Sequence, residues 1–315
     1  MGERNWNKAV VAVALYSVIY ALAGIWLGHR LFGPDYGHFD YPVFSFCGRH
    51  LSSLVEAAGF EGAYTESLIK ALLAGDRSDI SPQIRNIFRE SGASHLLALS
   101  GLHLGILYMI VSKALSALGN SPKARAVRGI STTAAAFFYM SITGATPSIT
   151  RAFLFILIRE TAAMTRRDAA PLEIFCLALS IQLLASPGCI AMPGFQLSYL
   201  AMCGIFLIHP HLAALYPEDG RRGWRNPMRK IWEMMSMSIS CQVFTAGIVW
   251  WHFHTFPKYF ILTNVISLPL TTIIVPLSLL TVTAASAGLC PPILIHAVDR
   301  LCDVLVFVLK TISEL

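Results

Sequence analysis

Long apolar runs, repeated along the chain, limit what this sequence can fold into more than any other feature. The first covers residues 9–28, and from residue 95 onward apolar runs alternate with short loops. A helix that crosses a bilayer needs about 20 mainly apolar residues. Only 13% of the 315 residues are charged, against about 25% in soluble domains. The sequence therefore predicts a polytopic membrane protein, excludes a disordered chain and argues against a soluble enzyme.

We expect an all-α transmembrane bundle of about eight spans, because helices satisfy every backbone hydrogen bond in lipid. After the first run, the candidate spans are 95–118, 127–145, 148–164, 172–186, 193–209, 231–251 and 259–284, followed by an amphipathic stretch at 293–312. The short runs 148–164 and 172–186 are candidates for re-entrant or half-length helices. The run 259–284 contains Pro269 and Pro276, which predicts a proline-broken helix.

Three segments divide the chain. We expect residues 1–29 to form an N-terminal transmembrane anchor, residues 30–94 an extracytoplasmic amphipathic helical segment, and residues 95–315 the main membrane domain. Residues 21–23 resemble a signal-peptide cleavage site, but the apolar run continues through 25–27, which favours a retained anchor.

The segment 30–94 mixes both signs of charge and carries helix signals. Thr65 can cap a helix that Gly75 ends, and Ser81-Pro82 can start another that Gly92 ends. Four apolar residues of this segment fall on one helical face: Leu51, Leu54, Val55 and Ala58. We expect amphipathic helices that lie against the membrane or against one end of the bundle.

Lysine and arginine gather in every second loop, at 119–128, 165–171 and 210–230. The intervening loops at 144–148 and 186–194 have none. The positive-inside rule then places the N-terminus in the cytoplasm. The net charge of +6 is too small to imply duplex binding by itself, and the seven cysteines show no CxxC pair or metal-ligand spacing.

Residues 94–105 carry the most informative polar pattern. On a continuous helix one stripe holds four small residues, Ser94, Ala98, Gly101 and Gly105, which would let another helix approach closely. The opposite arc of about 140° holds His95, Ser100 and His103. These three side chains either line a wet cavity or make hydrogen bonds between helices.

Further polar residues interrupt later apolar runs. They are Ser148 with Arg151, Gln196 with Ser198 and Tyr199, Ser238 with Gln242, and Asn264 with Ser267. Snorkelling to the interface is the alternative for Arg151, and contacts between helices are the alternative for the others. Together they predict a polar path through the bundle, helped by aromatic faces at Phe195, Tyr199 or Trp251.

Ser100 and His103 also invite an intramembrane serine hydrolase, since side chains three residues apart share a helix face. No GxSxG motif surrounds Ser100 and no acidic residue is near to orient the imidazole. Two HxH pairs, His209 with His211 and His252 with His254, lack an accompanying Asp, Glu or Cys cluster. We therefore expect no catalytic residue, no metal and no cofactor.

Four motifs in fixed order resemble those of the ComEC-type competence protein family. They are ALLAGDR at 71–77 followed by FRESGASHLLALSGLH at 88–103, GATPSITRA at 144–152, PGFQLSY at 193–199, and FP at 256–257 with NVISLP at 264–269. The resemblance covers about two thirds of the chain. It implies an inner-membrane channel that passes single-stranded DNA into the cytoplasm during natural transformation. A transporter of another solute is the second alternative, beside the hydrolase.

The resemblance implies a DNA path lined by His95, Ser100, His103, Ser148, Arg151, Gln196 and Ser198; Gln242 and Asn264 join them from the polar pattern. Expected partners are single-stranded DNA, membrane lipid, a separate nuclease, a DNA receptor, a cytoplasmic translocase and a second copy of the chain. Longer members of the family add an OB-like domain and a metallo-β-lactamase-like domain. Residues 30–94 read as helical, and no HxHxD motif is present, so strand degradation is not expected from this chain.

Overall fold

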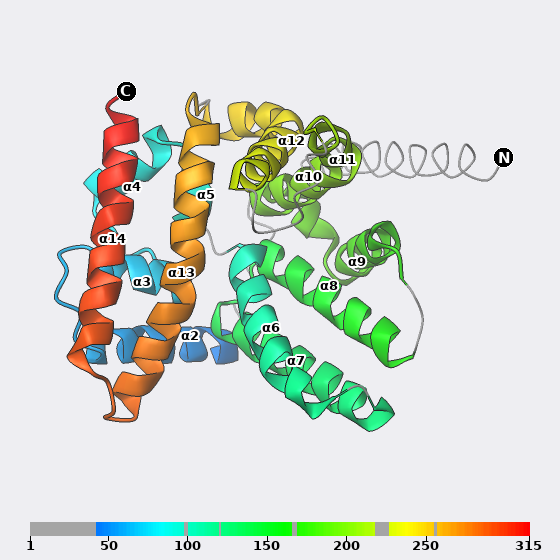
Figure 1. The fold of residues 1–315 in the computed structure, drawn as a ribbon, viewed down its shortest axis with the longest axis horizontal. Helices are drawn as coiled ribbons and strands as arrows, with labels where there is room; N and C mark the ends of the chain where they lie inside the picture. The colour runs from blue at the N-terminus through cyan, green and yellow to red at the C-terminus, as the bar shows by residue number, and fades with distance from the viewer. Residues whose placement is uncertain (1–41, 98–99, 120, 166–168, 218–226, 255–256) are drawn as a thin grey trace.

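The described part of the chain is helical throughout. A computed structural model describes residues 42–97, 100–119, 121–165, 169–217, 227–254 and 257–315, and it contains no strand within these ranges (Figure 1). The α-helices are α2 Pro42–Ala57, α3 Thr65–Ala74, α4 Pro82–Glu90, α5 Ser94–Leu97, α6 Gly101–Leu115, α7 Pro122–Ile142, α8 Pro147–Met164, α9 Pro171–Ala185, α10 Pro193–Leu207, α11 His209–Ala213, α12 Pro227–Phe253, α13 Phe260–Ser286 and α14 Pro292–Ser313. Short 3₁₀ turns occupy Ser116–Leu118 and Pro187–Ala191. The predicted anchor at 1–29 lies outside the described residues.

Proline begins most of the longer helices, because its missing N–H is not needed in the first turn and its φ angle already suits a helix. The hydroxyl oxygens of Ser81 and Ser121 cap two of these helices by accepting hydrogen bonds from the N–H groups of Ile84 and Ala124, at 3.3 and 3.1 Å. Gly75 ends α3 in the left-handed conformation, with φ of 76°. These helix limits confirm the predicted signals, except that Thr65 is the first residue of α3 and not its cap.

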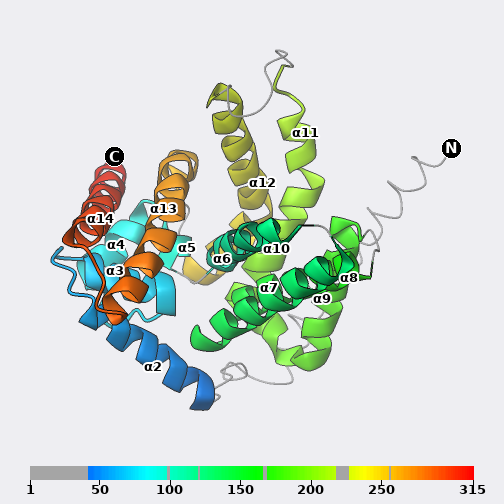
Figure 2. The same ribbon diagram turned by 60° about the horizontal axis from the view of Figure 1, so that its bottom comes forward.

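The helices pack in two groups around separate cores. Helices α2, α3, α4 and α5 surround the hairpin of α13 and α14 and bury a large apolar cluster that includes Val55, Leu72, Phe88, Ile274 and Leu305. Helices α6 to α12 form the other group, with one core among α6, α7 and α8 and a second among α8, α9 and α10. In both views α12 stands beside α10 (Figures 1 and 2).

The described part of the segment before residue 95, residues 42–94, is therefore part of the bundle. Its helices α3 and α4 pack on α14, and α2 packs on α3, α7 and α13. The carboxylate of Asp299 on α14 accepts hydrogen bonds from the backbone N–H groups of Glu61 and Gly62, at 3.2 and 3.1 Å. The described helices of this segment pack against the bundle as expected, and their contact with the membrane stays a prediction.

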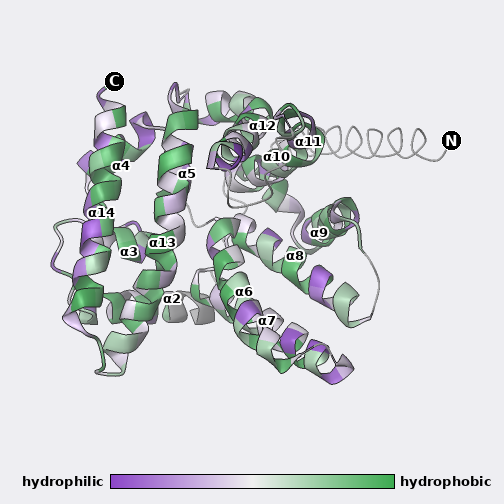
Figure 3. Cartoon of the chain, viewed as in Figure 1, coloured by the Kyte–Doolittle hydropathy of each residue, from purple (hydrophilic) through white to green (hydrophobic). Residues whose placement is uncertain are grey.

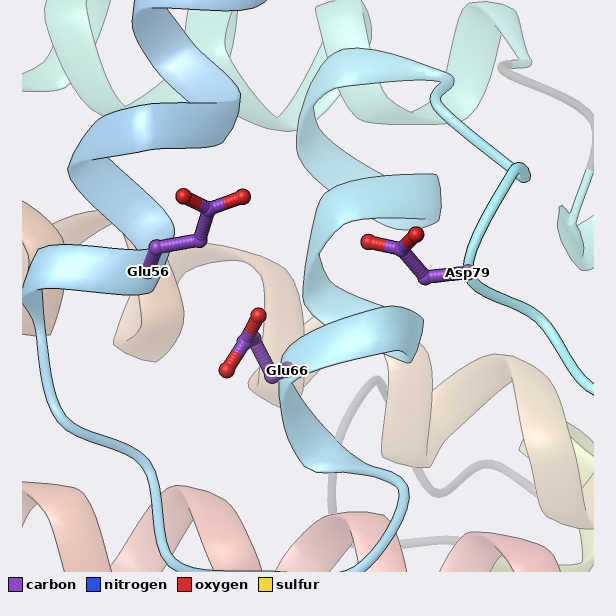
Figure 4. Close-up of side chains that lie close together, drawn as sticks. All are labelled: Glu56, Glu66 and Asp79. Carbon is purple, nitrogen blue, oxygen red and sulfur yellow. The ribbon is translucent and has the colours of Figure 1, made fainter.

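Lys70 on α3 is buried, and its ammonium group contacts three acidic side chains. Figure 4 shows these side chains, Glu56, Glu66 and Asp79, close together. The ammonium nitrogen of Lys70 lies 2.7 Å from Glu56, 2.9 Å from Glu66 and 2.7 Å from Asp79. Burial alone would lower the pKa of Lys70, but the hydrogen bonds to Asp79, Glu56 and Glu66 raise it above its usual value. The three carboxylates approach one another closely enough to hold a metal ion, and the ammonium supplies the positive charge in their midst.

Two described helical stretches are long and apolar enough to cross a membrane, Gly101–Leu118 and Phe260–Ser286. The structure thus supports an all-α fold but not the predicted count of about eight spans. Helices α9 and α10 have 15 residues each, about 22 Å of helix, whereas the hydrocarbon core is about 30 Å thick. Figure 3 shows α13 mainly in the hydrophobic colour, while α8 and α14 carry hydrophilic bands.

The continuous helix predicted over 95–118 is wrong, because the chain divides there into α5 and α6. Ser100 has extended backbone angles and caps α6 by accepting the N–H of Leu102 at 3.2 Å. The predicted packing stripe is therefore broken. Ala98 lies outside the described residues, the Ser94 hydroxyl donates to the carbonyl of Phe88 at 3.5 Å, and nothing lies within 4 Å of a Cβ built on Gly105.

Candidate functional site

The first turns of α6, α8 and α10 meet at one place in the second group of helices. A Cβ built on Gly101 of α6 would lie 3.1 Å from the Cβ of Ala152 and 3.2 Å from Nη2 of Arg151, both on α8. The Ser148 hydroxyl of α8 donates to the carbonyl of Gly194 on α10 at 3.3 Å. Three helix N-termini, each with its positive dipole end, therefore lie close together.

Arg151 is the charged residue at this junction. Its Nη1 atom donates to the backbone carbonyl of Ser198, and its guanidinium lies over the Tyr199 ring, 5.8 Å from the ring centre. Arg151 is half-buried, and no carboxylate of the described residues forms an ion pair with it. The side chain thus packs on α10 and brings a positive charge that no described acidic group neutralises.

Tyr199 and Gln182 support this arginine from α10 and α9. The Tyr199 hydroxyl donates to Oε1 of Gln182 at 2.9 Å, and Nε2 of Gln182 donates to the carbonyl of Pro147 at 3.2 Å. The Tyr199 ring also packs on Phe195 and Phe175, with ring centres 4.6 and 5.5 Å away. We refer to Arg151, Ser148, Ser198, Tyr199 and Gln182 as the Arg151 cluster.

Sequence reasoning missed Gln182. The available signal was a lone amide near the end of the apolar run 172–186, because a polar group inside an apolar helix needs a partner. The expected aromatic faces also need correction: Phe195 and Tyr199 are 2% and 6% exposed, and only Trp251, at 75%, is open. The two buried rings pack within the bundle and are not available for stacking on a base.

Gln196 lies beside the cluster and links α10 to α12. Its Nε2 atom donates to the carbonyl of Ile190 at 2.9 Å, and its Oε1 atom lies 3.2 Å from Nε2 of His252. His252, one residue of the second HxH pair, thus has the side-chain amide of Gln196 as its partner. His209 and His211 lie on the short helix α11.

The structure separates the three polar residues predicted on one helix face. His95 is exposed, and its Nδ1 atom lies 3.2 Å from the carbonyl of Gly92. His103 is 1% exposed, and within the described residues neither ring nitrogen has a hydrogen-bond partner. The Ser100 hydroxyl caps α6, so Ser100 and His103 do not form the hydrogen-bonded pair that the hydrolase alternative requires.

Asn264 belongs to a second polar group, between α12 and α13, and Gln242 lies on α12. Nδ2 of Asn264 donates to the hydroxyl of Ser238 at 3.3 Å. Within the described ranges, Oδ1 of Asn264, Nε2 of Gln242 and the Ser267 hydroxyl are buried without a partner. Of the predicted lining residues, the Arg151 cluster therefore unites Ser148, Arg151 and Ser198, with Gln196 adjacent.

Comparison with known proteins places these motifs in a family context. A family model described as "Competence protein" matches residues 72–315. The chain is 26% identical over 209 residues to ComE operon protein 3 of Bacillus subtilis (strain 168), covering 66% of this chain and 24% of that protein. It is 23% identical over 259 residues to the protein named "Uncharacterized protein YcaI" of Escherichia coli (strain K12), covering 79% of this chain and 33% of that one. The chain thus spans a quarter to a third of the length of these relatives, and no solved structure matches it.

Proposed function

Because the chain belongs to the competence protein family, we propose that its helical bundle forms a membrane channel that passes single-stranded DNA into the cytoplasm. Family membership supports a role in competence. The observation that carries the proposal further is Arg151, held on α10 without a described acidic partner at the junction of three helix N-termini. An arginine that no acidic side chain neutralises can form an ion pair with a phosphate group of the DNA backbone.

The physical requirements of such a path favour this junction. A single strand needs positive potential along its backbone, and an arginine offers planar donors that match a phosphate. The N-terminal ends of α6, α8 and α10 add partial positive charge and backbone N–H groups. The Ser148 hydroxyl, now donating to Gly194, is a further donor at the same place.

The membrane arrangement is part of the proposal. We place the chain in the plasma membrane as a multi-pass protein with a cytoplasmic N-terminus, because the basic loops alternate with loops that hold no lysine or arginine, or only Lys258. We expect a single cysteine at Lys123 to be protected from an impermeant thiol reagent outside the cell, and one at Ala63 to react. Both positions are exposed. With the native cysteines replaced, labelling at position 123 from outside would contradict this orientation.

The proposal assigns no catalytic step to this chain. Since the chain corresponds to only part of its relatives, a nuclease, a DNA receptor and a cytoplasmic translocase are proposed as separate partners. Membrane lipid surrounds the bundle, and a second copy of the chain is a further proposed partner. A transporter of another solute would leave DNA uptake unchanged when the chain is removed, which the following experiment tests.

The direct test measures uptake of labelled DNA by a competent host. Duplex DNA with a fluorophore on each strand is supplied to cells that contain or lack this chain, and nuclease-protected label inside the cytoplasm is counted. We expect label from one strand when the chain is present and background when it is absent, with recovery on re-expression. Equal uptake in both strains would refute the DNA channel.

A further inference from the structure

The Arg151 cluster forms a closed series of contacts that starts and ends on α8. Arg151 lies over the ring of Tyr199 on α10, the Tyr199 hydroxyl donates to Gln182 on α9, and Gln182 donates to the carbonyl of Pro147. Pro147 begins α8, four residues before Arg151. The series therefore fixes both the support beneath the guanidinium and the start of the helix that carries it.

From this geometry we infer that Gln182 and Tyr199 are positioning residues, which hold the Arg151 guanidinium toward the N-terminus of α6 for contact with a phosphate. The inference rests on the proposed function. Neither supporting side chain can contact a DNA strand directly, since Gln182 is 5% and Tyr199 6% exposed. They act on the DNA only through Arg151, whose Nη2 atom lies toward Gly101 at the start of α6.

A purely space-filling role does not explain the choice of side chains. Burying an amide costs free energy unless its donor and acceptor are both paired, and Gln182 pairs both. Apolar groups of similar shape in place of both partners would be nearly neutral for stability. We infer that the hydrogen bonds orient the Tyr199 ring, because they oppose its rotation and its displacement beneath the Arg151 guanidinium.

The informative variant keeps the packing of both side chains and removes their hydrogen bonds. Gln182→Met with Tyr199→Phe keeps the volume and the ring but removes the hydrogen bond between them and the one from Gln182 to the carbonyl of Pro147. We expect this double variant to purify and melt like the native chain. Its affinity for a fluorescent oligo-dT strand should fall about three- to tenfold, the range of one net hydrogen bond. If the double variant fails to fold, Tyr199→Phe alone, which leaves the Gln182 bond to Pro147, replaces it.

A second background separates positioning from general structure. In a chain that already carries Arg151→Gln, we expect the double variant to cause no additional loss of affinity, since coupled residues are not additive. An equal loss in both backgrounds, or no loss in the native background, would overturn the inference. If Arg151→Gln itself leaves binding unchanged, the proposed phosphate contact fails instead. The two failures are therefore distinguishable.

Discussion

Replacing Arg151 with glutamine is expected to reduce uptake of labelled single-stranded DNA about ten- to hundredfold, the value of one or two charged hydrogen bonds, while the amount of folded protein stays close to normal. The reason is that Arg151 is held at the junction of α6, α8 and α10 and has no ion pair among the described residues. Glutamine keeps a donor for the Ser198 carbonyl but removes the charge. Arg151→Lys keeps the charge and loses the planar pair of donors, so we expect an intermediate loss.

Arg159 provides a matched control on the same helix. It is exposed and lies over the Tyr108 ring, 5.6 Å from the ring centre, two turns beyond Arg151. Arg159→Gln removes the same charge from α8, and we expect uptake close to native. Equal losses in both variants would mean that overall charge, and not the junction, controls uptake.

Salt dependence gives a second reading of the same variants. A residue that contacts one phosphate contributes about 0.7 to the slope of log affinity against log salt for a single strand. Purified Arg151→Gln protein should therefore bind an oligo-dT strand with a slope shallower by about that amount, whereas Arg159→Gln protein should keep the native slope. An unchanged slope in the Arg151 variant would contradict a phosphate contact.

Helix positions were largely predictable, because apolar length and proline placement act locally. The predicted runs 148–164 and 172–186 differ from α8 and α9 by one residue at the ends. The proline break predicted in the run 259–284 is wrong, because α13 runs continuously from Phe260 to Ser286 with Pro269 and Pro276 inside it. The membrane count was less predictable. The apolar periodicity identifies a helix, but it does not decide whether that helix is long enough and has few enough charges to cross the membrane.

The division at Ser100 shows where apolar pattern misleads. Residues 95–118 are uniformly apolar enough for one helix, yet a serine hydroxyl competes for the N–H groups of the next turn. The pair Ser100-Gly101 therefore starts a new helix. Recognising this cap would have removed both the predicted packing stripe and the shared face of Ser100 and His103.

Contacts between helices limited what could be predicted about the site. Ser148 and Arg151 share α8, so the sequence could group them, but their α10 partners at Gly194 and Ser198 depend on how the helices pack. Gln182 reaches the cluster from α9, and its run gives no sequence pattern that groups it with Arg151. Only the packed structure shows that these distant positions meet.

Glycine at 204 carries the second large expected effect, on folding. Helices α10 and α12 approach so closely there that a Cβ on Gly204 would lie 2.8 Å from the carbonyl carbon of Ser240, 3.3 Å from the nitrogen of Cys241 and closer still to the Ser240 oxygen. These are backbone atoms, so no side-chain rotation relieves the clash. Gly204→Ala is expected to cost about 3 kcal/mol or more, at or above the upper end for overpacking, and to reduce the monodisperse yield sharply.

Two other glycines, Gly101 and Gly105, serve as controls for the stability of the Gly204→Ala variant. At Gly101 the nearest atom to a new Cβ is the Cβ of Ala152 at 3.1 Å, and at Gly105 nothing lies within 4 Å. Alanine at Gly105 should be neutral or slightly stabilising, because alanine favours a helix by about 1 kcal/mol over glycine. Alanine at Gly101 should fall between the two. Thermal melting and size-exclusion yield of the three variants in one detergent test this order. A Gly204→Ala protein that matches Gly105→Ala would show that α10 and α12 do not make this close backbone contact.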